Sequence, residues 1–322
     1  MTARPAQSWP PAQARPPRHF LRDDDLSPAE QAQVLALAAR LKAGRLTPGQ
    51  PQPLAGPKTV AVLFDKPSLR TRVSFAAGVT ELGGYPLLID MQATHAGRGE
   101  SIADLARVLD RQVAAIAWRT FRQADIAALA AVSSVPVINT LTDEFHPCQV
   151  LADLQAVQAV AGRLTGVTLA FLGDGSGNMA HSYLLGGATA GLHVRICGPA
   201  GYPPDPAVLA AARAIAARTG GSAGFGSDPG AACDGADFLA TDVWTSMGQE
   251  GQEAERAAAM EPFRLDEAKL ALAGPGARAL HCLPAHRGAE ITAGVIDGPA
   301  SLAFDQAENR LHAQKALLCW LL

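Results

Sequence analysis

The sequence predicts an α/β protein of two doubly wound parallel-sheet lobes, joined by a helix and followed by a C-terminal helix. Short apolar runs of strand length alternate with helical stretches in two successive series along the chain. The runs are apolar throughout, which is typical of parallel strands covered on both faces. With 322 residues, the chain is long enough for two domains that each have their own core.

The composition indicates a globular protein and argues against several classes of partner. The chain is 48% hydrophobic and 18% charged, and its net charge of -3 lacks the excess of Lys and Arg that a nucleic-acid surface needs. The 5 cysteines are scattered, without a CxxC pair, which disfavours a disulfide framework or a zinc site. We find no secretory signal and no bilayer-spanning apolar run. We therefore expect a cytoplasmic protein that binds neither nucleic acid nor membrane.

The first predicted helix follows a segment without periodicity. Residues 1–17 are rich in Pro, Ala and Gln, and we interpret them as a disordered extension. Ser27 and Glu30 then form a capping box with Pro28 at the first helical position, and Gly44 supplies a stop.

Two series of apolar runs follow, and we predict them as strands. A long helix beginning at His146-Pro147 is the predicted connection between the series, and residues 306–322 form the predicted last helix. Such a fold places its site in the crevice at the carboxyl ends of the strands. The predicted strands are Thr59–Phe64, Pro86–Ile89, Ala114–Trp118 and Val135–Ile138, then Val167–Leu172, His193–Cys197, Asp237–Thr241 and Arg278–Leu283.

The strongest local signal is the segment Asp65–Arg72, which follows the first strand and leads into a helical stretch, Val73–Leu82. A helix N-terminus offers unpaired N–H groups and a favourable dipole to an anion. Hydroxyl groups of Ser68 and Thr71 and the nearby guanidinium groups add phosphate donors. The segment therefore predicts a phosphate site without a Walker pattern. The alternative is an ordinary capped helix with solvated arginines.

Two other kinds of site are disfavoured. Residues 175–180 fit the dinucleotide pattern GxGxxG/A, but the next strand ends in Ile196-Cys197-Gly198-Pro199 without the carboxylate that would bind a ribose. We therefore expect no cofactor. No HExxH motif occurs and the histidine spacing does not make a metal site, so we expect no metal. Structural or surface roles are expected for His19, His181, His193, His286 and His312.

The motif Ser-x-Arg-Thr-Arg after the first strand resembles the carbamoyl phosphate loop of the aspartate and ornithine carbamoyltransferases. Further motifs of that family follow in the same order, and the resemblance covers roughly residues 18–322. The further motifs are Trp118-Arg119-Thr120, His146-Pro147-Cys148-Gln149, Gly173-Asp174 with Asn178-Met179, Asp242–Gly248, His281-Cys282-Leu283-Pro284 and Glu308-Asn309-Arg310. The last three of them resemble motifs of the ornithine-specific members.

The resemblance implies a transferase that moves the carbamoyl group of carbamoyl phosphate to the δ-amine of ornithine, giving citrulline and phosphate in arginine biosynthesis. It also implies a cis peptide bond before Pro284 and a homotrimer or an assembly of trimers. The implied catalytic residues are Arg119, His146, Asp242, Cys282 and Arg310. Carbamoyl phosphate is expected at Ser68, Leu69, Arg70, Thr71, His95, Arg119, His146, Gln149, Cys282, Leu283 and Arg310, and ornithine at Asn178, Asp242, Ser246 and Met247.

The same resemblance implies a division of the chain. Residues 18–147 are expected to bind carbamoyl phosphate and residues 148–300 to bind ornithine. Residues 301–322 are expected to form a helix that returns to the first domain.

Two positions depart from the family pattern. Leu69 replaces a threonine in the phosphate loop, which removes one hydroxyl donor. His95 stands where, or close to where, related enzymes carry a glutamine that reaches the phosphate of a neighbouring subunit. Two alternatives stay open at this point: a carbamoyltransferase for another amino acid or amine, and a catalytically silent paralogue.

Overall fold

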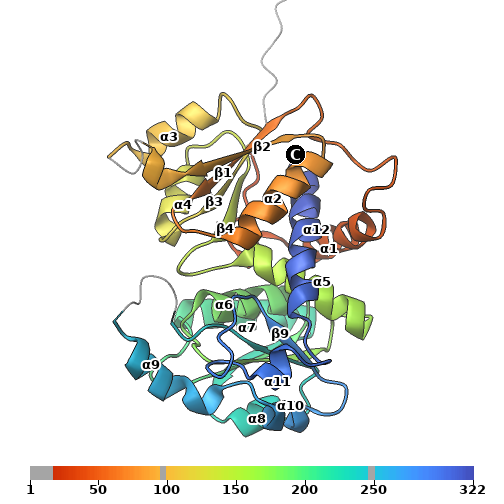
Figure 1. The fold of residues 1–322 in the computed structure, drawn as a ribbon, viewed down its shortest axis with the longest axis vertical. Helices are drawn as coiled ribbons and strands as arrows, with labels where there is room; N and C mark the ends of the chain where they lie inside the picture. Colours follow the sequence, from red (N-terminus) through yellow and green to blue (C-terminus); the bar gives the residue numbers. More distant parts are fainter. Residues whose placement is uncertain (1–16, 95–98, 246–250) are drawn as a thin grey trace, which may run out of the picture.

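A computed structural model of the chain describes residues 17–94, 99–245 and 251–322. It contains two parallel sheets that lie in separate lobes, one above the other in Figure 1. The predicted α/β class, with two parallel-sheet lobes, is therefore confirmed. Apart from residue 17, the predicted N-terminal extension lies outside the described residues.

The first lobe is built on a sheet of four strands in the order β2-β1-β3-β4. These strands are β1 (Thr59–Phe64), β2 (Tyr85–Asp90), β3 (Ala115–Arg119) and β4 (Val137–Leu141). The helical elements around it are η1 (Asp23–Asp25), α1 (Pro28–Ala43), α2 (Leu69–Glu81), η2 (Met91–Ala93), α3 (Ile102–Leu109) and α4 (Gln123–Ala130). The predicted capping box of α1 is present, since Ser27 N donates to Glu30 Oε2 at 2.9 Å and Glu30 N donates to Ser27 Oγ at 3.4 Å.

The second lobe is built on a sheet of five parallel strands in the order β7-β6-β5-β8-β9. The strands are β5 (Thr168–Leu172), β6 (His193–Cys197), β7 (Ser222–Gly226), β8 (Phe238–Thr241) and β9 (Arg278–His281). Its helical elements are α6 (Asn178–Ser182), the π-helical turn η4 (Tyr183–Gly187), α7 (Pro206–Thr219), α8 (Pro229–Cys233), α9 (Glu253–Met260), η5 (Glu261–Phe263), α10 (Glu267–Ala273) and α11 (Ala293–Ile296).

Two helices hold the lobes together. Helix α5 (Pro147–Ala161) connects β4 of the first sheet to β5 of the second, as predicted for a helix starting at His146-Pro147. Helix α12 (Ala303–Leu321) leaves the second lobe and packs against α5, α1 and α2 (Figure 1). Leu154 of α5 and Leu317 of α12 belong to one hydrophobic core that includes residues of both sheets. Burying a leucine side chain stabilises the fold by roughly 1.5–3 kcal/mol, so this shared core opposes separation of the lobes.

The structure also corrects three expectations. Strand β7 was not predicted, because Gly224 and Gly226 weaken the strand signal of a partly exposed edge. The predicted cover on both faces fails for β2, an edge strand with Tyr85 57% exposed. Helices α2 and α12 begin at Leu69 and Ala303, before the predicted Val73 and Gln306. Within the described residues, no helix is long and apolar enough to cross a membrane.

Candidate active site

A cavity of about 640 Å³ lies at the carboxyl ends of strands from both sheets. The loops after β1, β3 and β4 form one side, and the loops after β5, β8 and β9 form the other. The predicted crevice between two doubly wound sheets is therefore present. Its lining includes the predicted site residues Ser68, Leu69, Arg70, Thr71, Arg119, His146, Asn178, Asp242, Cys282, Leu283 and Arg310.

The phosphate loop ends in the N-terminus of α2. Ser68 is the N-cap residue, and its Oγ accepts a hydrogen bond from Thr71 N at 3.2 Å. The Ser68 hydroxyl proton thus stays available for a ligand, since the oxygen, not the hydrogen, makes the cap. Leu69 occupies the first helical position and its side chain is 75% exposed. Arg70 is the next residue along this first turn and lines the cavity.

Three guanidinium groups from three separate elements face this cavity. Arg70 comes from α2, Arg119 from the end of β3 and Arg310 from α12. Burial, followed by the charges of Arg310 and Arg70, lowers the pKa of Arg119 to about 10. Burial also lowers the pKa of Arg310, with a further contribution from Arg70. Each cation makes the charged form of the others less favourable, so the cluster is suited to binding a multiply charged anion.

Arg310 is held in place by hydrogen bonds behind the cavity. Its Nη1 donates to Gln149 Oε1 at 2.8 Å, and its Nη2 donates to Thr71 Oγ1 at 3.2 Å. Gln149 is 1% exposed and does not belong to the described lining of the cavity. Its Nε2 donates to Asp153 Oδ1 at 2.8 Å. In this structure Gln149 therefore holds Arg310 by a hydrogen bond outside the cavity. Its predicted contact with the carbamoyl group stays a prediction.

His146 lies at the N-cap of α5 and lines the cavity. Its backbone N donates to Ser182 Oγ at 2.8 Å, and its Nδ1 is buried without a partner among the described residues. Burial lowers the pKa of His146 well below its usual value, and Arg310, Arg119 and Arg70 lower it further. The imidazole is therefore neutral at pH 7 and offers one N–H and one lone pair.

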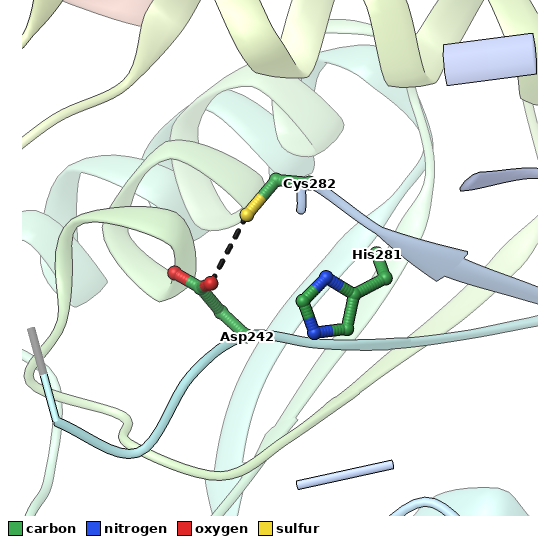
Figure 2. Close-up of side chains that lie close together, drawn as sticks. All are labelled: Asp242, His281 and Cys282. Carbon is green, nitrogen blue, oxygen red and sulfur yellow. Dashed lines mark hydrogen bonds between the residues drawn. The ribbon is translucent and has the colours of Figure 1, made fainter. Parts of the chain in front are cut away.

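Asp242 and Cys282 line the cavity on the opposite side. Cys282 Sγ donates to Asp242 Oδ1 at 3.0 Å (Figure 2). Burial raises the pKa of the Cys282 thiol well above its usual value, and the Asp242 charge raises it further. The sulfur thus stays protonated and acts as a donor rather than as a nucleophile. Asn178 lies on the same side, where its Nδ2 donates to Thr142 O at 2.7 Å.

His281 neighbours this pair but is committed elsewhere. Its nearest ligand atom and those of Asp242 and Cys282 all lie within 4.8 Å of one another, a spacing that would suit a metal ion. However, Nδ1 of His281 accepts from Leu283 N at 2.9 Å, and Nε2 contacts Glu290 Oε1 at 3.1 Å. Because both ring nitrogens are occupied, His281 has no lone pair for a metal. The ring instead orders the turn that carries Cys282 and Leu283.

That turn has an unusual backbone. Leu283 has a φ of 57°, and the Leu283-Pro284 peptide bond is cis, as the resemblance implied. A positive φ is rare for a branched residue and is maintained only where the surroundings impose it. The bond from Leu283 N to the buried His281 ring is one such constraint.

The glycine-rich turn after β5 packs tightly and lies on the same side of the cavity as Asp242 and Cys282. A Cβ on Gly175 would lie 2.6 Å from Tyr202 O, so the glycine is needed for packing against the loop after β6. Asp174 Oδ1 accepts from Ser176 N at 2.9 Å, and its other oxygen forms an ion pair with Arg256. Arg256 Nε also donates to Trp244 O at 2.7 Å. Packing and turn geometry therefore account for the dinucleotide-like pattern.

Some site predictions lie beyond what can be placed, and some site residues were missed. His95, Ser246 and Met247 lie outside the described residues. His286, for which a structural or surface role was expected, lines the cavity. Further lining residues are Lys66, Ser176 and Thr245, which lie within segments that the sequence singled out but had no role assigned to them. Phe121, Leu141 and Asp143 also line the cavity, and their only sequence signal is a position at or just after a strand end.

Comparison with protein families gives two matches that together span most of the chain. The carbamoyl-P binding domain of aspartate/ornithine carbamoyltransferase matches residues 18–159. The Asp/Orn binding domain of the same family matches residues 165–321.

Individual proteins are similar along nearly the whole length. An ornithine carbamoyltransferase of Leifsonia xyli is 58% identical over 305 residues, which cover 95% of this chain and 97% of that protein. One from Mycolicibacterium paratuberculosis is 56% identical and covers 95% and 98%. The structure of ornithine carbamoyltransferase from Pyrococcus furiosus superposes with a TM-score of 0.89 at 44% identity, over 94% of this chain and 96% of that one. The chain belongs to the aspartate/ornithine carbamoyltransferase family.

Proposed function

We propose that this protein transfers the carbamoyl group of carbamoyl phosphate to the δ-amine of ornithine, releasing citrulline and phosphate. The observation that carries the proposal is the cavity itself, in which three guanidinium groups face the Asp242–Cys282 pair. One side suits a phosphate dianion and the other suits an ammonium group. The relatives named ornithine carbamoyltransferase at 56–58% identity support the choice of amine.

The phosphate is held at the start of α2. Ser68 supplies a hydroxyl group, the N-terminal turn supplies the backbone N–H of Leu69, and Arg70 and Arg119 supply charge. Thr71 Oγ1 already accepts from Arg310, so its hydroxyl proton is directed to another acceptor. These donors bind the substrate and also stabilise the phosphate as it leaves.

The carbonyl oxygen lies among Arg119, Thr71 and the neutral His146, which donate to it as negative charge develops. The carbonyls of Cys282 and Leu283, with Gln149, position the carbamoyl NH₂, and Arg310 completes the cluster. Removing one donor of this kind typically slows a reaction by about 10²–10³-fold. Most of the remaining acceleration comes from holding two substrates in one geometry.

The amine side orients ornithine through Asn178 and Asp242, with Ser246 and the Met247 backbone proposed as further contacts. The δ-ammonium first loses one proton, because only the neutral amine has a lone pair. The amine nitrogen then forms a bond to the carbonyl carbon, and the bond from that carbon to the phosphate oxygen breaks. Phosphate leaves with the electron pair, and the second proton leaves the nitrogen.

We also propose an assembly and a domain division for the chain. The protein forms a homotrimer or an assembly of trimers, in which His95 of one subunit reaches the phosphate of the next. Donation by a histidine is stronger when it is protonated, so carbamoyl phosphate affinity should fall as pH rises through roughly 6–7. A flat affinity across that range would contradict the role of His95. The predicted division at residues 18–147, 148–300 and 301–322 is supported by the position of α5 between the two sheets.

A direct assay tests the proposed function. Carbamoyl phosphate is supplied with ornithine, lysine, putrescine or aspartate in parallel, and phosphate and the carbamoylated product are measured. We expect strong preference for ornithine. Turnover of another amine alone would overturn the substrate assignment, and no turnover with any of the four would favour a silent paralogue.

A further inference from the structure

We propose that Asp153 and Gln306 are positioning residues that tie Arg310, on the phosphate side of the cavity, to the turn that carries Cys282 and Leu283 on the amine side. This inference rests on the proposed function. Neither residue belongs to the described lining of the cavity, and each is completely buried. Their effect on the reaction therefore has to act through the residues they hold.

The Asp153 carboxyl group receives three hydrogen bonds. Its Oδ1 accepts from Gln149 Nε2 at 2.8 Å and from Gln306 Nε2 at 2.6 Å. Its Oδ2 accepts from Tyr183 OH at 2.7 Å. Because the amide nitrogen of both glutamines donates to the same oxygen, both amides are fixed with their oxygens directed away from Asp153.

Each outward-facing amide oxygen then holds one part of the site. Gln149 Oε1 accepts from Arg310 Nη1 at 2.8 Å, and Gln306 Oε1 accepts from His281 N at 2.9 Å. His281 is the last residue of β9, directly before Cys282. A buried chain of hydrogen bonds thus runs from a cation of the phosphate side to the backbone of the amine side.

The hydrogen-bond chain is built from two helices, α5 and α12, that pack against each other (Figure 1). Gln149 and Asp153 are four residues apart on α5, and Gln306 and Arg310 are four residues apart on α12. Residues with this spacing lie on the same face of a helix. The two facing pairs make a closed arrangement in which a shift of Arg310 on binding phosphate reaches His281 through buried groups alone.

The consequence is a division of effects between the substrates. Without Gln306, Arg310 still has Gln149 and Thr71 as partners, so carbamoyl phosphate binding should change little. The backbone N–H of His281 would lose its acceptor. The turn that carries Cys282 would then no longer be held in a fixed position relative to Arg310. We therefore expect impaired use of ornithine with nearly normal binding of carbamoyl phosphate.

The test uses the full-length protein with Gln306→Met, which keeps the side-chain length and removes the amide. We expect kcat/KM for ornithine to fall about 10-fold or more, with binding of a non-hydrolysable phosphonate analogue of carbamoyl phosphate within about 3-fold of wild type, as follows from losing one buried acceptor. The matched control is Gln155→Met, because Gln155 is also buried, lies on α5 and has an unpaired Oε1 among the described atoms. This control should retain wild-type kinetics.

Gln306→Glu gives a second readout that a purely structural role would not produce. Glutamate keeps an acceptor for His281 N, but its second oxygen faces Asp153, so the pair must share a proton. Activity relative to wild type should therefore be higher at pH 6 than at pH 8. If Gln306→Met does not fold, this pH series decides the matter.

Three results would overturn the inference. Unchanged ornithine kinetics in Gln306→Met would do so, as would equal losses of analogue binding and ornithine use. A Gln306→Glu variant with the pH profile of wild type would also contradict it. Absence of citrulline from the wild-type protein would overturn the proposed function and this inference with it, whereas normal wild-type turnover with an unaltered Gln306→Met variant overturns the inference alone.

Discussion

The two sides of the cavity carry opposite charge and differ in how that charge is compensated. The phosphate side gathers Arg70, Arg119 and Arg310, whose charges repel one another in a buried setting. The amine side carries Asp242, which accepts from the protonated thiol of Cys282. The cluster of cations on the phosphate side is unfavourable until an anion binds, whereas the Asp242 carboxylate on the amine side already accepts a hydrogen bond. Binding energy should therefore come mainly from the phosphate, while the amine side selects and orients the second substrate.

The two sides also differ in how they are supported. Arg310 is held by side chains of α5 and α2, which are long helices with shared core contacts. Asp242 and Cys282 instead lie on the turns that follow β8 and β9, and Asn178 is the first residue of the short helix α6. Sites built on helices hold side chains more rigidly than sites built on loops. The contrast indicates a preformed phosphate side and a more adaptable amine side.

The largest effect should come from Arg119→Met. We expect kcat/KM to fall by at least about 10²–10³-fold, because a charged donor to the reacting group is lost. The unliganded protein should become more stable, because the lowering of the Arg119 pKa to about 10 marks an unfavourable charge in the folded state. That lowering corresponds to an energy on the order of 3 kcal/mol. Urea unfolding without ligand and steady-state kinetics check both parts, and a less stable variant would contradict an unfavourable buried charge at this position.

The next effect concerns Asp153, the buried carboxyl group that holds Gln149, the partner of Arg310. Burial raises the pKa of Asp153 from 3.8 to about 6, although Gln306, Tyr183, Gln149 and Arg310 oppose the rise. The folded state therefore holds an extra proton between roughly pH 4 and 6, and this group's contribution to stability decreases as pH rises through that window. The decrease should be about 1.4 kcal/mol per pH unit.

Asp153→Asn should remove this dependence, since asparagine keeps an acceptor for both glutamines and the Tyr183 hydroxyl can reverse to accept. The measurement is the free energy of unfolding of both proteins from pH 4.5 to 7.5. Parallel curves for the two proteins would show that Asp153 does not titrate in this range.

A smaller and more selective effect is expected for Cys282→Ala. The substitution keeps the backbone carbonyl and removes the donor to Asp242, so the KM for ornithine should rise about 10-fold, the scale of a lost hydrogen bond to a charged group. Carbamoyl phosphate binding should stay within about 2-fold, since the phosphate donors are untouched. Cys282→Ser should lie between alanine and wild type, and Cys319→Ala, on α12, is the control. A weaker grip on carbamoyl phosphate alone would reverse the assignment of sides.

The smallest effect should be a gain at Leu69. Threonine restores a hydroxyl donor at the first position of α2, worth roughly 0.5–1.5 kcal/mol, so carbamoyl phosphate should bind about 2- to 10-fold more tightly. Leu69→Val is the control because valine has the shape of threonine without the hydroxyl. Equal affinities of the threonine and valine variants would mean that side-chain size, not the missing hydroxyl, determines binding here.

The two sides were not equally predictable from the sequence. Ser68, Arg70 and Thr71 belong to one short motif after an apolar strand, so local pattern and chemistry were enough to find them. Asp143 and His286 follow strand ends as well, but no local pattern distinguishes them from ordinary loop residues. Strand β7 was missed because its two glycines and partial exposure give a weak strand signal.

The buried support of the site was beyond any sequence pattern. Asp153 and Gln306 are 153 positions apart, and their contact depends on how α12 packs against α5. The sequence identifies Gln149 as a member of a substrate-binding motif, yet its orientation toward Arg310 is set by Asp153 from inside the protein. Such polar contacts follow from tertiary packing, which periodicity does not encode.

The measurement that tests the division of the cavity most directly is calorimetric titration of a non-hydrolysable phosphonate analogue of carbamoyl phosphate into wild type, Arg119→Met and Cys282→Ala. The account predicts at least about a 10-fold loss of affinity in Arg119→Met, from one charge-assisted contact, and wild-type affinity in Cys282→Ala. Equal losses in both variants, or a loss confined to Cys282→Ala, would contradict a phosphate side made of guanidinium groups.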